Sequence, residues 1–388
     1  MKHIIYIINF SFLLLLNQGC SKKGDGQRME ESQTIPVMFN PDRFPRLDSF
    51  ISKITVIPLE TNDNCLLRDQ LHGVKVHQDL IYINNMSREL YVFDMNGKFI
   101  REIGSRGQGP GEFLEVRDFI ITNEGTIEIL DYQKIEYYTL EGNYIETKRF
   151  NTISEDFYCN PSNFCKSSSS VYYLWGGMKD GGNPRRHEKA NLLYRLNSDM
   201  QIDTGFFDTK FGDGGTSDRF KYYQDRILFV RSSVDYNVYQ IDSNDSLSIR
   251  YTFDFDKYGM KTGENDDRQT VRDFIEEYVS GMVHYQETDR FIYFNFVYKN
   301  YVYCLLYSKA TGQVFINFLW SVENEKEIRL FNIKAIHNDL LVAVVDVSWL
   351  KMDLDRMSPE NIKKWGLEAC HNLNDEDNPV LIIYKTKF

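Results

Sequence analysis

The chain has 388 residues and a formal net charge of −11, and 14% of its residues are aromatic. An acidic body of this size repels the phosphates of nucleic acid, so we exclude a nucleic-acid-binding function. The 25 Tyr and 27 Phe residues favour strands, because aromatic side chains fit the half-buried surface of a β-sheet.

The N-terminal segment is typical of a signal peptide. Lys2 precedes an apolar run, residues 4–16, that is too short to span a bilayer comfortably as a mature helix. The glycine directly before Cys20 resembles the lipobox of bacterial lipoproteins. We therefore predict that residues 1–19 are removed, that Cys20 is lipidated, and that residues 20–34 form a flexible tether. The alternative is a secreted form without a lipid.

The remaining residues, 35–388, contain no second long apolar run. We expect them to form one domain that meets the membrane only through its lipid anchor. Five cysteines remain besides Cys20, and their spacings match no metal-binding knuckle. Cys159 and Cys165 could form a disulfide in an oxidising compartment, or could be ordinary buried thiols.

Two consecutive stretches share one pattern of strands and turns. They are residues 74–103, VKVHQDLIYINNMSRELYVFDMNGKFIREI, and residues 119–150, FIITNEGTIEILDYQKIEYYTLEGNYIETKRF. Gly97 and Gly142 supply the positive φ that a hairpin turn requires. They lie 45 residues apart, which is the length of a four-stranded propeller blade.

Weaker copies of this pattern follow, for six copies in all. Their second strands are anchored at Ile81, Ile127, Val171, Ile227, Phe291 and Leu341. Six blades can close into a ring and so avoid exposed sheet edges. The alternating segment 50–61 has no partner in its own repeat and should complete the last blade. The sequence therefore predicts an all-β fold, a six-bladed β-propeller closed by an N-terminal strand, with a few short helices in insertions.

Four stretches resemble the six-bladed β-propeller lipoproteins of gram-negative bacteria, a group related to NHL-type propellers. These stretches are ITVIPLET, KFIREIGSRGQGPGEF, RILFVRSSVDYNVYQI and DNPVLIIYKTKF. The resemblance covers nearly all of the chain after the leader. It implies the fold and a location at the outer membrane, periplasmic or surface-exposed, but no settled activity.

The glycine-rich segment IGSRGQGPGEF, residues 103–113, raises the question of phosphate binding. It lacks the Lys and hydroxyl of a Walker loop, and the chain after it returns to strand, so no helix N-terminus faces an anion. We interpret the glycines as scaffolding that carries the chain from one blade to the next. Arg106 and Gln108 in this loop should border the mouth of the central channel.

Histidines and carboxylates offer weaker hypotheses. His77, His284 and His337 each precede the first tight turn of a repeat, but sites spread around a ring are too far apart to share a metal ion. We predict no metal and no cofactor. Three carboxylates occupy turns in which propeller glycosidases keep catalytic acids: Asp131, Asp235 and Asp346. Their simpler role is to accept hydrogen bonds from turn amides.

Two insertions, residues 175–191 and 349–379, lie where second and third strands join, on the face of the glycine-rich loop. In the latter, Ser358 and Pro359 predict the start of a short helix. A third insertion, residues 263–281, predicts an amphipathic helix. Long loops on one face mark the working side of a scaffold. The candidate ligand-binding residues on this face are Arg88, Arg106, Gln108, Tyr132, Trp175, Arg185, Arg186, Arg231, Tyr298 and Trp349.

Arginine and aromatic side chains together suit stacking on sugars and binding of carboxylates. We therefore predict a monomeric, non-enzymatic binding protein of the cell envelope, whose partner is a glycan, a peptide or an envelope protein. The alternative is a glycan hydrolase or lyase at the channel mouth, and hydrolysis requires two facing carboxylates about 5 to 10 Å apart. A third possibility, a structural subunit of an uptake complex, predicts a wide apolar patch on a rim.

Overall fold

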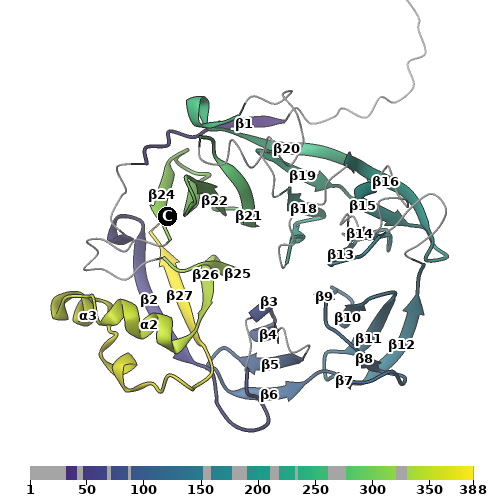
Figure 1. Ribbon diagram of the computed structural model, residues 1–388, viewed down its shortest axis with the longest axis horizontal. Coiled ribbons are helices and arrows are strands. Elements are labelled where there is room, and N and C mark those ends of the chain that lie inside the picture. The colour runs from purple at the N-terminus through teal and green to yellow at the C-terminus, as the bar shows by residue number, and fades with distance from the viewer. Residues whose placement is uncertain are drawn as a thin grey trace, which may run out of the picture. The chain divides into compact units, whose positions relative to one another are not determined.

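In a computed structural model of the chain, six antiparallel sheets stand around a common centre (Figure 1). The structure describes residues 32–41, 47–67, 71–85, 89–151, 159–176, 190–209, 218–231, 235–260, 277–319 and 330–387. The predicted signal peptide, Cys20 and most of the predicted tether lie outside the described residues. All six sheets belong to one compact unit, Ser32–Phe388.

Each sheet contains one blade of four antiparallel strands with its first strand nearest the centre (Figure 1), and the four strands are consecutive in the chain in blades 1 to 5. Blade 1 consists of β3 (Leu71–His77), β4 (Leu80–Asn85), β5 (Leu90–Asp94) and β6 (Phe99–Glu102). Blade 2 consists of β9 (Asp118–Ile121), β10 (Thr126–Asp131), β11 (Lys134–Thr139) and β12 (Tyr144–Arg149). Blade 3 consists of β13 (Asn163–Lys166), β14 (Tyr172–Trp175), β15 (Ala190–Leu196) and β16 (Ile202–Thr209). Blade 4 consists of β17 (Lys221–Tyr223), β18 (Arg226–Val230), β19 (Asn237–Ile241) and β20 (Leu247–Asp254). Blade 5 consists of β21 (Ser280–Glu287), β22 (Phe291–Tyr298), β23 (Tyr301–Ser308) and β24 (Val314–Phe318). Blade 6 consists of β25 (Ile333–His337), β26 (Leu340–Val345), β27 (Val380–Thr386) and β2 (Ile51–Pro58).

The ring is closed by the N-terminal strand β2, as the sequence predicts. β2 pairs antiparallel with the C-terminal strand β27, with Ile54 opposite Tyr384. Ile54 and Tyr384 are both buried in the cluster that joins blades 5 and 6. Because strands from both ends of the chain form one blade, the predicted propeller and its closure are confirmed.

A further N-terminal strand, β1 (Gln33–Pro36), adds to the outer edge of blade 4 and runs parallel to β20. The apolar residues Ile35, Val37 and Phe39 alternate with polar or exposed ones, and all three are buried. Phe39 packs edge-on against Tyr298 of blade 5, with ring centroids 5.3 Å apart. β1 was not predicted, although this alternation is visible in the sequence.

The core lies between neighbouring blades and is made of apolar side chains from their facing surfaces. Cys159 and Cys165 are both buried and free, so the buried-thiol alternative holds for this pair. Burial raises the pKa of each thiol above its ordinary value, so both are held in the neutral form.

The described helices are short. α2 (Val347–Leu354), α3 (Pro359–Trp365) and the 3₁₀ turn η3 (Glu368–Asn372) lie in the insertion between β26 and β27, and η1 (Leu47–Ser49) and η2 (Asp256–Tyr258) lie elsewhere. α3 begins as predicted, because Ser358 Oγ accepts a hydrogen bond from the Asn361 amide. In the described part of the chain, no helix is long and apolar enough to cross a membrane. Most of the predicted helix in residues 263–281 lies outside the described residues.

Candidate functional site

The glycine-rich loop between blades 1 and 2 folds back on itself. Its strands β7 (Ser105–Arg106) and β8 (Glu112–Phe113) pair in parallel, and the Glu112 carboxylate accepts a hydrogen bond from the Gly109 amide at 2.8 Å. Gly104 has a φ of 68°, and a Cβ there would lie 2.5 Å from a ring carbon of Phe113. Only glycine meets both demands. The loop therefore serves as packed scaffolding that directs the chain into β9.

A cavity of about 610 Å³ lies beside this loop, between blade 2 and the start of blade 3. Its walls come from the glycine-rich loop, the turn between β10 and β11, and residues 159–161 before β13. We call it the loop-face pocket, because it is lined by the connections between blades and by the turn that joins the second and third strands of blade 2. Its polar lining residues are Gln108, Arg117, Asp131, Tyr132, Gln133, Lys134, Arg149 and Asn160.

Arg117 and Tyr132 form a platform in the loop-face pocket. The guanidinium carbon of Arg117 lies 4.1 Å from the centroid of the Tyr132 ring. Arg117 Nη1 donates hydrogen bonds to Asn160 Oδ1 at 2.6 Å and to the Pro161 carbonyl at 2.8 Å, which fix its orientation. Tyr132 has a φ of 43° and stays 40% exposed. A cation stacked on an exposed ring is an interaction surface for a planar or apolar ligand face.

The other charges of the loop-face pocket differ in how they are paired. Asp131 is 1% exposed, and its Oδ2 accepts a hydrogen bond from the Leu114 amide at 3.0 Å. Lys134 Nζ binds Glu136 Oε1 at 2.5 Å, so its charge is neutralised within blade 2. Arg149 is exposed at the end of β12, and no ion pair joins it to another described residue. Its guanidinium is therefore available to a ligand.

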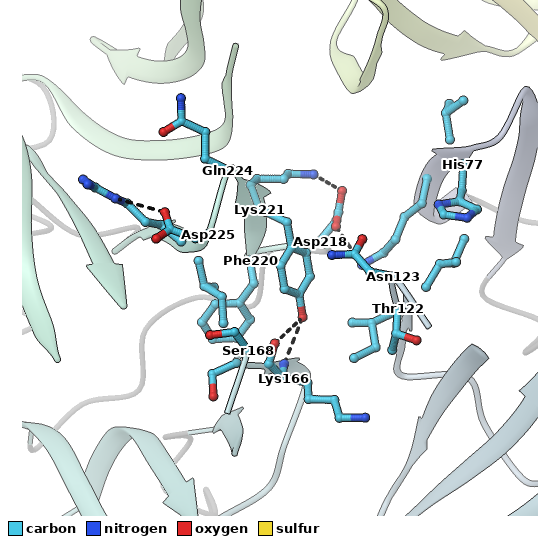
Figure 2. Close-up of a pocket in the computed structure, with 18 of the residues that line it drawn as sticks. His77, Thr122, Asn123, Lys166, Ser168, Asp218, Phe220, Lys221, Gln224 and Asp225 are labelled. Carbon is cyan, nitrogen blue, oxygen red and sulfur yellow. Dashed lines mark hydrogen bonds and ion pairs between the residues drawn. The ribbon is translucent and has the colours of Figure 1, made fainter. Parts of the chain in front are cut away.

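A second cavity, of about 480 Å³, lies at the centre of the ring (Figure 2). We call it the axial cavity. All six blades contribute to its lining, for example through His77, Asn123, Lys166, Lys221, Gln286 and Ile336. It opens at the end of the blades opposite the loop-face pocket, because Asn123 precedes β10 and Tyr132 follows it.

A network of buried charges stands in the axial cavity. Lys75 Nζ lies 3.4 Å from Asp118 Oδ1 and 3.0 Å from Asp218 Oδ1, and Asp218 also pairs with Lys221 (Figure 2). Burial opposes the charge on Lys75, but Asp118 and Asp218 outweigh it and raise the pKa of Lys75. Burial likewise opposes the charge on Asp218, yet Lys221 and Lys75 lower its pKa. These ion pairs hold the first strands of blades 1, 2 and 4 together.

The three histidines are not equivalent in the structure. His77 and His337 end β3 and β25 just before their turns, as predicted. His284 lies three residues before the end of β21, which corrects the prediction, because irregular register in β21 shifts it and gives it a φ of 55°. Burial, followed by the charges of Lys334 and Lys221, lowers the pKa of His284 to about 3. In the described residues no three metal-ligating side chains come together.

The structure brings together only two of the predicted ligand-binding residues, Gln108 and Tyr132, in the loop-face pocket. Arg106 is exposed on β7 outside the pocket lining. Arg231 Nη1 pairs with Asp235 Oδ2 at 3.2 Å. Trp349 lies on α2 beside a separate small cavity that Asp346 also lines. Arg88, Arg185 and Arg186 lie outside the described residues.

Two predicted ligand-binding residues lie in the core instead of on the working face. Trp175 is 2% exposed, because Phe220 and Phe229 of blade 4 pack against its ring. Tyr298 is 5% exposed, because Phe39 after the unforeseen strand β1 covers it. Both residues end a second strand, where inward and outward side chains alternate, so the sequence alone did not distinguish their directions.

The basic residues that line the two cavities were not among the residues predicted from the sequence. Arg117 stands directly after the glycine-rich loop and before β9, and this position is a signal that could have been used. Lys75, Lys166 and Lys221 each come from a different blade, and no sequence motif connects them. The candidate carboxylates are also separated: Asp131 and Asp346 line different cavities. Asp235 accepts hydrogen bonds from the Asn237 amide and the Tyr239 hydroxyl, the simpler role considered for it.

Comparisons with known proteins agree with this architecture. The model of the family described as "Domain of unknown function (DUF4934)" matches residues 33–385. A crystal structure from Bacteroides fragilis, of a protein whose name describes it as exported, is 17% identical, with a TM-score of 0.68 over 92% of this chain and 99% of that one. A member of the DUF4221 family from Bacteroides vulgatus is 12% identical, with a TM-score of 0.50 over 87% of this chain and 97% of that one. No curated protein matches the sequence. At these identities the structural likeness supports the fold alone.

Proposed function

We propose that this chain, which belongs to the DUF4934 family, is a non-catalytic ligand-binding lipoprotein of the outer membrane. The N-terminal apolar run and Cys20 support export and lipidation. The similarity to a Bacteroides protein described as exported supports a location in the envelope or outside the cell. A propeller is a rigid scaffold, and its loops are free to carry a binding site.

The ligand site is the loop-face pocket, and the ligand is an acidic glycan. The single observation that carries this proposal is the fixed Arg117–Tyr132 platform with, in the same cavity, Arg149, which forms no ion pair with any residue that the structure describes. A sugar ring stacks on an exposed aromatic ring, and a guanidinium binds a carboxylate through two parallel hydrogen bonds. Gln108 adds an amide that can bind a sugar hydroxyl.

The dimensions of the pocket favour a short glycan over a folded protein partner. Its volume of about 610 Å³ falls in the range of small-ligand sites, roughly 300 to 1,000 Å³. A stable protein–protein interface would instead bury about 800 Å² on each partner. A glycan of a few sugar units therefore fits the described cavity better.

The pattern of carboxylates does not favour hydrolysis. Among the described residues that line the loop-face pocket, Asp131 is the one carboxylate, and it holds the Leu114 amide. In the axial cavity, Lys221 and Lys75 lower the pKa of Asp218 against the effect of burial. Hydrogen bonds from its own backbone amide and from Thr122 lower the pKa of Glu124. A glycosidase needs a carboxylic acid whose pKa is raised, so these two groups do not suit that role. Burial does raise the pKa of Asp118, but its carboxylate already binds Lys75 and the amides of Phe119 and Phe164.

A glycan array tests the proposal. The protein would be the unlipidated chain beginning at residue 21, which keeps β1 in place. We expect binding to uronate- or sialate-bearing glycans, and at least a tenfold loss of affinity in Tyr132→Ala and in Arg149→Ala. Tyr301→Ala is the matched control, because Tyr301 is an exposed tyrosine at the corresponding turn of blade 5. Equal binding by all variants would place the ligand elsewhere.

A further inference from the structure

We propose that a small cavity between blades 5 and 6 is a second binding site, which takes an organic cation, a ring-sized apolar group that carries an ammonium nitrogen. We call it the blade 5–6 cavity. Its volume is about 180 Å³, and it lies where β24 and β26 end and where β25 and α2 begin. The loop-face pocket lies between blades 2 and 3, so this inference does not depend on the proposed glycan site.

The inside of the blade 5–6 cavity is apolar. Its walls include Leu319 after β24, Phe331 before β25, and Val344 and Val345 at the end of β26. Leu319 and Val345 are buried in the cluster that joins blades 5 and 6, and Phe331 packs against that cluster. An apolar cavity of about 150 Å³ can hold benzene. The volume of about 180 Å³ is therefore room for one ring-sized group.

The cavity carries one charged side chain, Asp346, among the described residues that line it. Asp346 is the N-cap residue of α2, where an Asp carboxylate usually accepts a hydrogen bond from an amide of the first turn, but its side chain makes no such bond. Asp346 is exposed, and Trp349, three residues further along α2, is 39% exposed. The carboxylate and the indole ring are therefore both accessible to a ligand.

The charge of Asp346 is not neutralised within the described part of the chain. Lys351, also on α2, is the nearest basic residue in sequence. It pairs with Asp375 Oδ1 at 2.8 Å and donates a hydrogen bond to the Leu373 carbonyl at 3.1 Å. No Lys, Arg or His of the described ranges forms an ion pair with Asp346. Partial burial raises the pKa of Asp346, and a cationic ligand would supply the missing positive charge.

The amide group of Asn332 in the cavity wall is held in one orientation. The Tyr293 hydroxyl donates a hydrogen bond to Asn295 Oδ1 at 2.6 Å, and Asn295 Nδ2 donates one to Asn332 Oδ1 at 2.7 Å. Asn295 is 1% exposed, so this bond turns the Asn332 oxygen toward the core of blade 5. Asn332 therefore leaves its amide N–H groups for the cavity, and these can lie against the face of a ligand ring.

These features together favour an ammonium group attached to an apolar body. Asp346 would accept a charge-assisted hydrogen bond from the nitrogen, and the Trp349 ring would attract the same positive charge. The apolar body would fill the cavity and leave water. A neutral ring lacks the first two interactions, and a small hydrophilic cation lacks the third.

A ligand-observed NMR titration of the unlipidated chain tests this site, with benzylammonium as the probe. Benzyl alcohol keeps the ring without the charge, and ethylammonium keeps the charge without the ring. We expect benzylammonium to bind with a Kd of about 1 mM or lower, and each of the other two to bind about tenfold more weakly. An absence of benzylammonium binding, or equal binding of all three compounds, would overturn the proposal.

Two substitutions separate the charge from the ring. Asp346→Asn should weaken benzylammonium binding about tenfold and leave benzyl alcohol binding unchanged, and Trp349→Ala should weaken benzylammonium binding about threefold. Asp355→Asn is the matched control, because Asp355 is an exposed carboxylate at the other end of α2. Benzylammonium affinity that is unchanged in Asp346→Asn, or equally reduced in Asp355→Asn, would contradict the proposal. Tyr132→Ala should bind benzylammonium as the wild type does, so the glycan proposal can fail without this one.

Discussion

The two cavities of the propeller hold their charges in different ways. In the loop-face pocket, Arg117 is oriented by two neutral acceptors and its Nε lies 3.6 Å from Glu115 Oε2, whereas Arg149 is exposed and forms no ion pair with another described residue, so Arg149 is the group available to a ligand's charge. In the axial cavity, Lys75, Asp118 and Asp218 are buried and mutually paired, and they join strands of different blades. The first arrangement can bind a ligand without affecting the fold. The second joins the blades to one another and so contributes to the stability of the ring.

This difference explains why the loop-face residues can be predicted from the sequence and the axial residues cannot. Loop residues such as Gln108 and Tyr132 lie beside turn signals, and their place on one face follows from the repeat. The axial lysines lie in short inner strands and resemble ordinary polar residues of those strands. Only closure of the ring brings them together.

The largest expected effect comes from breaking the axial network. Asp218→Asn leaves Lys75 and Lys221 without their shared carboxylate, and removal of one member of a buried ion pair costs about 3 to 5 kcal/mol. Urea unfolding should show this loss. Asp225→Asn is the control, because Asp225 is mostly exposed and its pairing should contribute less than about 1 kcal/mol. Similar losses in the two variants would show that the buried axial network stabilises the fold no more than an exposed ion pair does.

A substitution in the glycine-rich loop should also lower the free energy of unfolding. Gly104→Ala forces a Cβ against Phe113 at a φ of 68°, and we expect a loss of about 2 to 3 kcal/mol in the free energy of unfolding. Gly312→Ala is the control, because Gly312 has a φ of 69° and no heavy atom within 4 Å of the added Cβ. That variant should lose about 1 kcal/mol. A smaller loss in Gly104→Ala than in Gly312→Ala would show that packing at the loop does not matter.

The burial of His284 should also make stability depend on pH. The pKa of His284 is about 3 in the folded chain and about 6.5 when unfolded, so unfolding takes up a proton below pH 6.5. Stability should fall as the pH drops from 7 to 5, and His284 should account for about 2 kcal/mol of that loss. His284→Asn tolerates the φ of 55° and removes this contribution. Asp118 and Asp218 titrate in both proteins, so the difference between them isolates His284. Identical pH dependence in the two proteins would exclude this assignment.

The smallest expected effect on stability is at the loop-face ligand site. Arg149→Ala should change the free energy of unfolding by less than about 0.5 kcal/mol, because the side chain is exposed at the end of β12. Urea unfolding checks this value. A loss of 2 kcal/mol or more would mean that Arg149 supports the fold and is not free for a ligand.

The repeat predicted the fold well, because each blade carries its own alternation and turn glycines. The 45-residue spacing of Gly97 and Gly142 predicted the blade length, and segment 50–61 predicted the closing strand β2. The candidate site was predicted less well. Trp175 and Tyr298 are buried by residues from another blade and from β1, and such long-range packing leaves no local signal.

The most direct test of the contrast between the two cavities measures glycan affinity and the free energy of unfolding in the same variants. Both would be determined for the wild type, Tyr132→Ala and Asp218→Asn, under conditions in which every variant is folded. We predict that Tyr132→Ala loses at least tenfold in glycan affinity and keeps most of its stability, whereas Asp218→Asn loses about 3 to 5 kcal/mol of stability and keeps its glycan affinity. Loss of both properties in either variant, or of neither in both, would contradict the account.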